Sequence, residues 1–181
     1  MASYLYEDGL ETNRLFTRKL VFEDHIIWKD FFDDQAAIEF IPAFGLSTSA
    51  ERARHWIERQ LIRYEENRFG HQALIDKNTN AFIGQCGLLL QEVDGQPELE
   101  VGYHILPRYW GKGYATEAAI MFKEYGLKHQ LASSIVSIIN VKNFRSQAVA
   151  RKNGMIQERQ SKWMDQDVFI YRTYSNEKKS I

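Results

Sequence analysis

Apolar and polar residues alternate with a period of two along several stretches of the chain, as is typical of strands with one buried face. Within residues 98–106, positions 99, 101, 103 and 105 are apolar, whereas the intervening positions include Glu100, Gly102 and His104. This pattern predicts a strand with a core face and a second face that carries polar groups. Similar patterns predict six further strands, at residues 14–20, 71–76, 81–90, 134–139, 156–164 and 167–174.

Apolar residues recur at helical spacing in four other stretches, which predict helices at residues 23–32, 49–68, 114–129 and 143–153. Thr48 and Glu51 have the spacing of a capping box at the start of the second of these helices. Gly154 follows the last one, where glycine commonly ends a helix. Between the first two helices, the segment from Ile41 to Leu46 mixes apolar residues with chain breakers, so we interpret it as a loop that lines a pocket.

Composition limits the classes of protein that fit. The chain has 181 residues, 44% of them hydrophobic, and no compositional break, which predicts a single domain over residues 1–181 with its core at about 10–175. The 23 basic and 24 acidic residues nearly balance, so neither nucleic acid nor an anionic membrane is expected as a partner. One cysteine, Cys86, excludes an internal disulfide and fits a reducing compartment. With no apolar stretch long enough to span a bilayer, we expect a soluble, cytoplasmic protein.

The most informative motif lies at residues 107–119, where a predicted strand runs through a glycine-rich loop directly into a helix. Gly111 and Gly113 allow a sharp turn and leave backbone N–H groups free to face an anion, and the positive end of the helix points to the same place. Arg108 and Lys112 flank the loop and would add full charges. The motif predicts a site for a phosphorylated small molecule.

Two other nucleotide-binding motifs place glycines between a strand and a helix. The dinucleotide fingerprint needs a third glycine where this chain has Thr116, and an acidic residue after the next strand, which instead ends at Ile139-Asn140. A P-loop needs Ser or Thr directly after its lysine, whereas Lys112 is followed by Gly113. Both motifs are disfavoured.

The stretch from Pro107 to Ala118, which reads P-R-x-x-G-K-G-Y-A-T-E-A, resembles the acetyl-CoA motif of GNAT N-acetyltransferases of the RimJ/RimL type. The resemblance spans residues 10–175. Other matching elements occur in the family's order: Thr12-x-Arg14-Leu15, Phe82-Ile83-Gly84, Glu98 to Tyr103, Asn143-x-x-Ser146, and Lys152-Asn153-Gly154-Met155.

This resemblance implies an α+β fold with a mixed, mostly antiparallel sheet of about seven strands, flanked by about four helices. In that fold, strands four and five splay apart and acetyl-CoA enters the gap. Acetyl-CoA would be the acetyl donor, with backbone N–H groups from Gly111 to Ala115 at its pyrophosphate and Asn143 at its pantetheine arm. The cofactor-binding residues implied in this way are Ile105, Leu106, Arg108, Gly111, Lys112, Gly113, Tyr114, Ala115, Thr116, Asn140 and Asn143.

The family resemblance also suggests catalytic residues for direct attack of an amine on the thioester. Glu100 is the candidate base, acting through water, although a strand glutamate can equally be ion-paired or face solvent. Many members carry a tyrosine in the helix after strand five, where this chain has Ala150 and no tyrosine between Asn143 and Gly154. Ser146 is the candidate proton donor instead, although a hydrogen bond in the first turn of the helix, or protonation of the thiolate by water, explains the sequence as well.

The acceptor is not specified by the sequence. RimJ/RimL resemblance suggests a protein N-terminal amine, while amino acids, polyamines and antibiotics are accepted in the same branch, and a non-catalytic acyl-CoA-binding module is the alternative from another class. The first two helices, the Ile41 to Leu46 loop and the last hairpin should form the acceptor groove. Asp33 and Asp34 would suit a cationic acceptor, and helix-end solvation explains them equally well. The histidines lack metal-ligand spacing, so no metal is expected, and family members often form homodimers.

Overall fold

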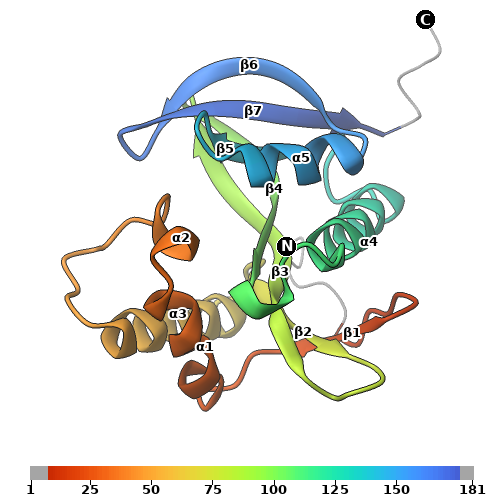
Figure 1. The fold of residues 1–181 in the computed structure, drawn as a ribbon. Helices are drawn as coiled ribbons and strands as arrows, with labels where there is room; N and C mark the ends of the chain where they lie inside the picture. Colours follow the sequence, from red (N-terminus) through yellow and green to blue (C-terminus); the bar gives the residue numbers. More distant parts are fainter. Residues whose placement is uncertain (1–7, 176–181) are drawn as a thin grey trace, which may run out of the picture.

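The computed structural model describes residues 8–175, which form a seven-stranded sheet flanked by helices (Figure 1). The strand order is β1-β2-β3-β4-β5-β7-β6, and every pairing is antiparallel except that of β4 with β5. The strands are β1 (Leu15–Lys19), β2 (His71–Asp76), β3 (Phe82–Val93), β4 (Gln96–Ile105), β5 (Ser134–Asn140), β6 (Ile156–Trp163) and β7 (Gln166–Tyr174). The helices are α1 (Asp24–Asp33), α2 (Gln35–Ile38), α3 (Ser49–Glu65), α4 (Tyr114–Lys128) and α5 (Phe144–Lys152), with a 3₁₀ turn η1 at Pro107–Tyr109.

The centre of the sheet is the long hairpin of β3 and β4. Its turn is made by Asp94 and Gly95, both with positive φ (52° and 72°), a backbone that matches the twist of a two-residue hairpin. The ladder then continues without a bulge from the Val93–Gln96 pair to the Gly84–Ile105 pair. This register places the odd-numbered residues of β4 on one face and Glu100, Gly102 and His104 on the other, as the sequence pattern predicts.

The sheet forks between β4 and β5. The only register pair that joins them among the described residues is Glu100 with Val136. Near this pair the Ser137 hydroxyl donates to the Val101 carbonyl (3.0 Å), and further along β4 the Trp110 Nε1–H donates to the Ile105 carbonyl (2.7 Å). On this edge of β4, the side chains of Ser137 and Trp110 thus take the place of backbone partners from β5.

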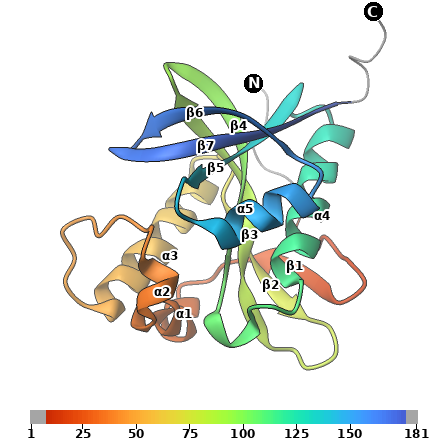
Figure 2. The ribbon, with the colours of Figure 1, turned by 45° about the horizontal axis from the view of Figure 1, so that its top comes forward.

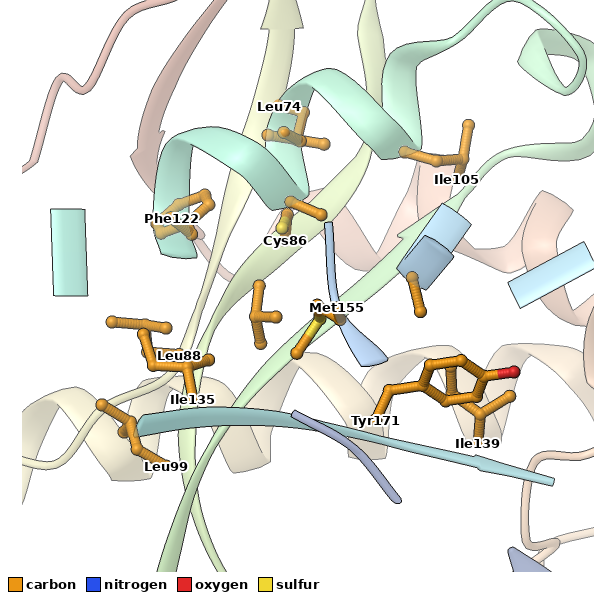
Figure 3. Close-up of a cluster of buried hydrophobic side chains, with 14 of the residues drawn as sticks. Leu74, Cys86, Leu88, Leu99, Ile105, Phe122, Ile135, Ile139, Met155 and Tyr171 are labelled. Carbon is orange, nitrogen blue, oxygen red and sulfur yellow. The ribbon is translucent and has the colours of Figure 1, made fainter. Parts of the chain in front are cut away.

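Helices cover the two faces of the sheet differently. Helix α4 lies on one face, while α1, α2 and α3 lie together on the other side (Figures 1 and 2). Under α4, Phe122 packs with Leu88 and Ile135 in the main core cluster, which also includes the fully buried Cys86 (Figure 3). Trp28 of α1 is the centre of a second cluster, beneath α1 and α3. The main cluster contains residues from strands on both sides of the fork, and a third, smaller cluster of Val93, Val136, Val168 and Ile170 packs where β5 and β7 meet the β3–β4 hairpin.

The fold class expected from the sequence is confirmed, and predicted elements differ from the observed ones mainly at their ends. Strand β3 extends to Val93, beyond its predicted end at residue 90, because its ladder with β4 continues to the turn. The prediction ended early because the alternating pattern weakens there. Helix α2 was not predicted, since its four residues are too short for a periodic pattern; the Asp34 side chain caps it by accepting from Ala37 N–H (2.9 Å). Within the described part of the chain, no helix is both long and apolar enough to cross a membrane.

Candidate functional site

A cavity of about 610 Å³ opens at the fork and reaches from the first turn of α4 to the α1–α3 side of the sheet. It brings together most of the residues singled out in the sequence. Those that line it are Glu100, Ile105, Gly111, Gly113, Tyr114, Ala115, Thr116, Asn140, Asn143 and Ser146.

Three of the candidate cofactor-binding residues lie outside the cavity lining. Leu106 is fully buried, and its N–H donates to the Ile83 carbonyl (3.0 Å) as the β3–β4 ladder ends. The Arg108 guanidinium forms an ion pair with Asp30 (2.7 Å) on the outer surface. The Lys112 ammonium lies 5.4 Å from the centre of the Tyr109 ring. Neither charged side chain lines the cavity, which leaves the backbone as the main polar component of the glycine loop.

The glycine loop has the backbone of an anion site. Gly111 and Gly113 have φ of 73° and 83°, a region that side chains strongly disfavour, and Gly113 begins α4 without any side-chain cap. Among the described residues, no partner accepts from the N–H groups of Tyr114, Ala115 or Thr116, whereas the Glu117 N–H already donates to the Gly113 carbonyl (3.0 Å). Three unpaired donors at a positive helix end fit a pyrophosphate of the kind that acetyl-CoA carries.

Arg14, which directly precedes β1, fixes this loop. Its guanidinium pairs with Glu117 (2.6 Å), donates to the Lys112 carbonyl (2.9 Å) and lies 4.3 Å from the centre of the Tyr114 ring. The Glu117 carboxylate also accepts from the Thr12 hydroxyl (2.5 Å), and these contacts keep the pKa of Glu117 below its usual value against the effect of burial. The sequence singled out Arg14 only as part of a family motif, because the contact joins residues about a hundred positions apart.

Glu100 lies at the fork itself and is 9% exposed. One carboxylate oxygen accepts from the Gln91 amide (2.9 Å) and the other from the Ile138 N–H of β5 (3.4 Å). Burial raises the pKa of Glu100, while these two hydrogen bonds and the positive charge of Arg63 act in the opposite direction. A buried carboxylate without an ion-pair partner at the mouth of a cavity has the setting of a general base.

A tyrosine hydroxyl accompanies Ser146, although α5 itself contains no tyrosine. Tyr103 of β4 donates to the Ser146 carbonyl (2.9 Å), and its oxygen lies 3.1 Å from the Ser146 hydroxyl. Burial raises the pKa of Tyr103, so its phenol keeps its proton. Sequence reasoning assigned Tyr103 to the core because of its strand face, and it does pack against the main core cluster. Because the sheet forks beside it, Tyr103 also lines the cavity.

Asn143 and Asn140 shape the cavity wall next to α5. Asn143 caps α5 by accepting from the Ser146 N–H (3.1 Å), so Ser146 occupies the first turn of that helix. The Asn140 side chain donates to Gln166 (2.8 Å) and accepts from the Lys142 N–H (2.9 Å). Their side-chain oxygens are therefore already engaged in holding the chain that follows β5.

On the opposite side, the cavity is lined by rings from α1, α3, β2 and β4. His104 lies with its ring centre 4.8 Å from that of Trp56 and 5.3 Å from that of His71, and Phe31 packs edge-on to it. Burial lowers the pKa of His104 to about 4 and that of His71 well below its usual value, so both rings are neutral at physiological pH. Gly102 is required here, because a Cβ would lie 2.8 Å from the His71 Nε2 atom.

The expected loop lines this side of the cavity, whereas the expected acidic pair does not. Residues 41–44 and 46 contribute to the lining. Asp33 instead pairs with Lys29 on the surface of α1, and Asp34 caps α2. Across residues 8–175, no group of three or more His, Cys, Asp or Glu side chains is arranged to hold a metal ion.

Comparison with known proteins identifies the family. Residues 14–156 match the family model described as an acetyltransferase (GNAT) domain. This chain belongs to the GNAT acetyltransferase family. Two Bacillus subtilis (strain 168) proteins are similar to this GNAT protein. YkkB, an uncharacterized protein, is 34% identical over 100 residues, which span 55% of this chain and 58% of YkkB. YnaD, an uncharacterized N-acetyltransferase, is 28% identical over 149 residues, or 82% of this chain and 83% of YnaD.

Solved GNAT structures share the fold over most of their length. A GNAT acetyltransferase from Bacillus anthracis superposes with a TM-score of 0.75 at 24% identity, covering 92% of this chain and 98% of that one. RimL, a ribosomal L7/L12 alpha-N-protein acetyltransferase in complex with coenzyme A, gives 0.73 at 15% identity, with 92% and 98% covered. MccE, a microcin C7 self-immunity acetyltransferase in complex with acetyl-CoA and AMP, gives 0.76 at 14% identity, with 94% and 98% covered. At these identities the likeness concerns the fold alone.

Proposed function

We propose that this protein transfers the acetyl group of acetyl-CoA directly to a primary amine, and that the amine is the N-terminus of a protein or peptide. The observation that carries the proposal is the position of Glu100. Glu100 lies at the fork, between the unpaired N–H groups at the start of α4 and the cavity wall of arginines and aromatic rings on α3. Family membership supports acetyl transfer, and the likeness in fold to RimL motivates the choice of an N-terminal amine.

In this proposal, acetyl-CoA supplies an electrophilic thioester carbon. The N–H groups of Tyr114, Ala115 and Thr116 hold its pyrophosphate. Glu100 accepts a proton from the attacking amine through water, and its raised pKa makes it a stronger base than an exposed carboxylate. The new bond joins the amine nitrogen to the acyl carbon, and the carbon–sulfur bond breaks to release a thiolate.

The thiolate then takes a proton from the paired hydroxyls of Ser146 and Tyr103. Many family members carry a tyrosine on α5 where this chain has Ala150. In this proposal, Tyr103 of β4 provides the phenol group instead. Ala150 is itself fully buried in the core, so it has no access to a thiolate. Ala150 was the one sequence feature in favour of a non-catalytic binding module, and in this proposal Tyr103 takes the role of the missing tyrosine.

A small-molecule amine is the alternative acceptor. The test is mass spectrometry of a pool of peptides with free N-termini, amino acids, polyamines and aminoglycosides after incubation with acetyl-CoA and the protein. We expect peptide N-termini to gain about 42 Da, because an acetyl group replaces one hydrogen on the nitrogen. Acetylation confined to small amines would contradict the proposed acceptor.

Glu100→Gln provides the control for catalysis in the same experiment. It should still bind acetyl-CoA in calorimetry but acetylate acceptors about 100-fold more slowly, a typical loss for a general base. Glu92→Gln, an exposed carboxylate on the neighbouring strand, is the matched control and should behave as the parent protein. Undiminished transfer by Glu100→Gln would show that Glu100 is not the base.

A further inference from the structure

Helix α3 presents a row of arginines to the cavity. Arg52, Arg59 and Arg63 all line it, and their spacing of seven and four residues puts them on one helix face. Within residues 8–175 none of the three forms an ion pair. By contrast, Arg14 and Arg172 on other elements pair with carboxylates. Charged arginines that line a cavity without a carboxylate partner leave several donors available to a ligand.

The hydrogen bonds that these arginines do make hold them in place without neutralising them. Arg52 Nε donates to the Leu46 carbonyl (3.1 Å), and Arg63 donates to the Phe69 carbonyl (3.4 Å). The Arg59 guanidinium lies 5.2 Å from the centre of the Phe44 ring, in the loop that closes the cavity. Each side chain is thus positioned by the surrounding backbone or a ring, and within residues 8–175 none is paired with a carboxylate, although Arg63 also interacts at longer range with Glu100 and Glu66.

The charges along this wall repel one another. Burial, and the nearby charges of Arg68 and Arg59, lower the pKa of Arg63. Glu100 is the only acidic residue among the described residues that line the cavity, and it interacts with Arg63 alone of the three. An anion bound beside Arg59 would relieve this repulsion, whereas a polyamine would increase it.

The coenzyme is not expected to supply that anion. Its phosphates belong at the start of α4, and α3 lies on the other side of the sheet (Figures 1 and 2). Basic residues are also present on the coenzyme side, since Arg145 and Lys152 of α5 line the cavity there. The α3 arginines therefore face the space left for the acceptor.

The length of the row indicates the size of the acceptor. Arg52 and Arg63 are eleven residues apart, about 16 Å along a helix axis at 1.5 Å per residue. An extended peptide covers about 3.4 Å per residue, so four or five residues match the length of the row. A free amino acid bound beside Glu100 would reach only Arg63, the arginine at that end of the row. A further polar group lies on the same wall: His71 is 1% exposed, and neither of its ring nitrogens has a partner in the described part of the chain.

We infer that the acceptor is a peptide N-terminus followed within its first few residues by acidic side chains, which Arg52, Arg59 and Arg63 bind. The inference rests on the proposed function and specifies its substrate. It differs from a cationic acceptor, the other possibility raised by the sequence, because Asp33 and Asp34 are engaged outside the cavity and arginines line the facing wall.

The test uses three peptides that differ only at positions two to four, which are glutamate, glutamine or lysine after a common N-terminal serine. Acetylation rates with acetyl-CoA are measured together with peptide binding to the protein–CoA complex. We expect kcat/KM to be at least about tenfold higher for the glutamate peptide than for the glutamine peptide, mainly through KM, and lowest for the lysine peptide. Equal values, the reverse order, or preference for free glutamate or phosphoserine over the peptide would overturn the inference.

Binding distinguishes failure of this inference from failure of the proposed function. If the glutamate peptide binds more tightly than the others but none is acetylated, the binding site for acidic peptides is supported and the proposed transfer to peptides is contradicted. If all peptides are acetylated with equal efficiency, transfer stands and the acidic preference falls. If no peptide binds or reacts, the acidic-peptide inference is rejected as well.

Charge variants locate the effect on α3. Arg59→Gln should lower the ratio of kcat/KM between the glutamate and glutamine peptides about tenfold, and Arg59→Glu should shift preference to the lysine peptide. Arg54→Gln, an exposed arginine on the same helix outside the cavity lining, is the matched control and should leave the ratio unchanged. An unchanged ratio in both Arg59 variants would assign the preference to another part of the protein.

Discussion

At the start of α4 the cavity is lined by unpaired backbone N–H groups, whereas on the α3 side the polar groups are side chains. The α4 side needs two glycines with positive φ and an uncapped helix end, all within a few consecutive residues. The α3 side combines Arg59 and Trp56 with His71 and His104 from strands β2 and β4. Backbone donors suit a ligand part that is always the same, and side chains suit one that differs between enzymes. We therefore expect variants on the two sides to affect donor binding and acceptor choice separately.

The largest effect that separates the two sides should come from Gly113→Ala. A Cβ at φ of 83° is disfavoured by about 1–2 kcal/mol and would meet the Arg14 guanidinium at 3.4 Å, so the loop should shift. We expect the KM for acetyl-CoA to rise about tenfold while the acceptor KM stays nearly constant, as measured by initial rates with each substrate varied.

Gly95→Ala is the matched control for that variant. Gly95 also has positive φ (72°), but it lies in the β3–β4 turn, away from the cavity. It should lose similar stability, with no change in the KM for acetyl-CoA. A rise in acceptor KM with Gly113→Ala equal to that for acetyl-CoA would contradict the separation of the two sides.

A smaller effect should come from the wall next to α5, which the two sides share. Tyr103→Phe removes the hydroxyl beside Ser146, and we expect kcat to fall severalfold to about tenfold with little change in either KM. The loss is moderate because a thiol near its pKa of about 8.5 is a good leaving group. Ser146→Ala is the companion variant, and stopped assays for released thiol provide the measurement. If neither variant lowers kcat, water protonates the thiolate.

The smallest expected effect concerns stability and comes from the buried base. Because burial raises the pKa of Glu100 above its unfolded value, stability is full below the unfolded pKa and falls as pH rises towards the folded pKa. Glu100→Gln has no such loss, so it should unfold at a higher temperature than the parent at pH 8, on the order of 1 kcal/mol or a few degrees.

The pH dependence of that difference is the decisive part of the measurement. Thermal scans at pH 5 and pH 8 should show the gain of Glu100→Gln shrinking at the lower pH, while Glu92→Gln shows no gain at either. A gain that is larger at pH 5 would mean that the carboxylate is stabilised by its hydrogen bonds more than it is destabilised by burial.

The two sides of the cavity also differ in how far the sequence predicts them. The glycine loop could be found because its residues are adjacent in the chain and its chemistry lies in the backbone. Tyr103 was missed because alternation places it correctly on a strand face without showing that the sheet forks beside it. The role of Arg14 was missed because its partner Glu117 lies on a distant element. Arg59 was missed because an arginine on an amphipathic helix has the same pattern whether it faces solvent or a cavity.

The single rung between β4 and β5 has a consequence for the molecule as a whole. Past Glu100 and Val136, the sheet contains two unpaired strand edges in its interior, and protein folds normally keep such edges short, charged or covered. A ligand bound in the fork, as proposed above, would cover both edges at once. Ligand concentration then adds to folding stability by mass action, about 2.7 kcal/mol at 100 times the dissociation constant. The resistance of the protein to unfolding and proteolysis would thus increase with the concentration of the ligand that binds in the fork.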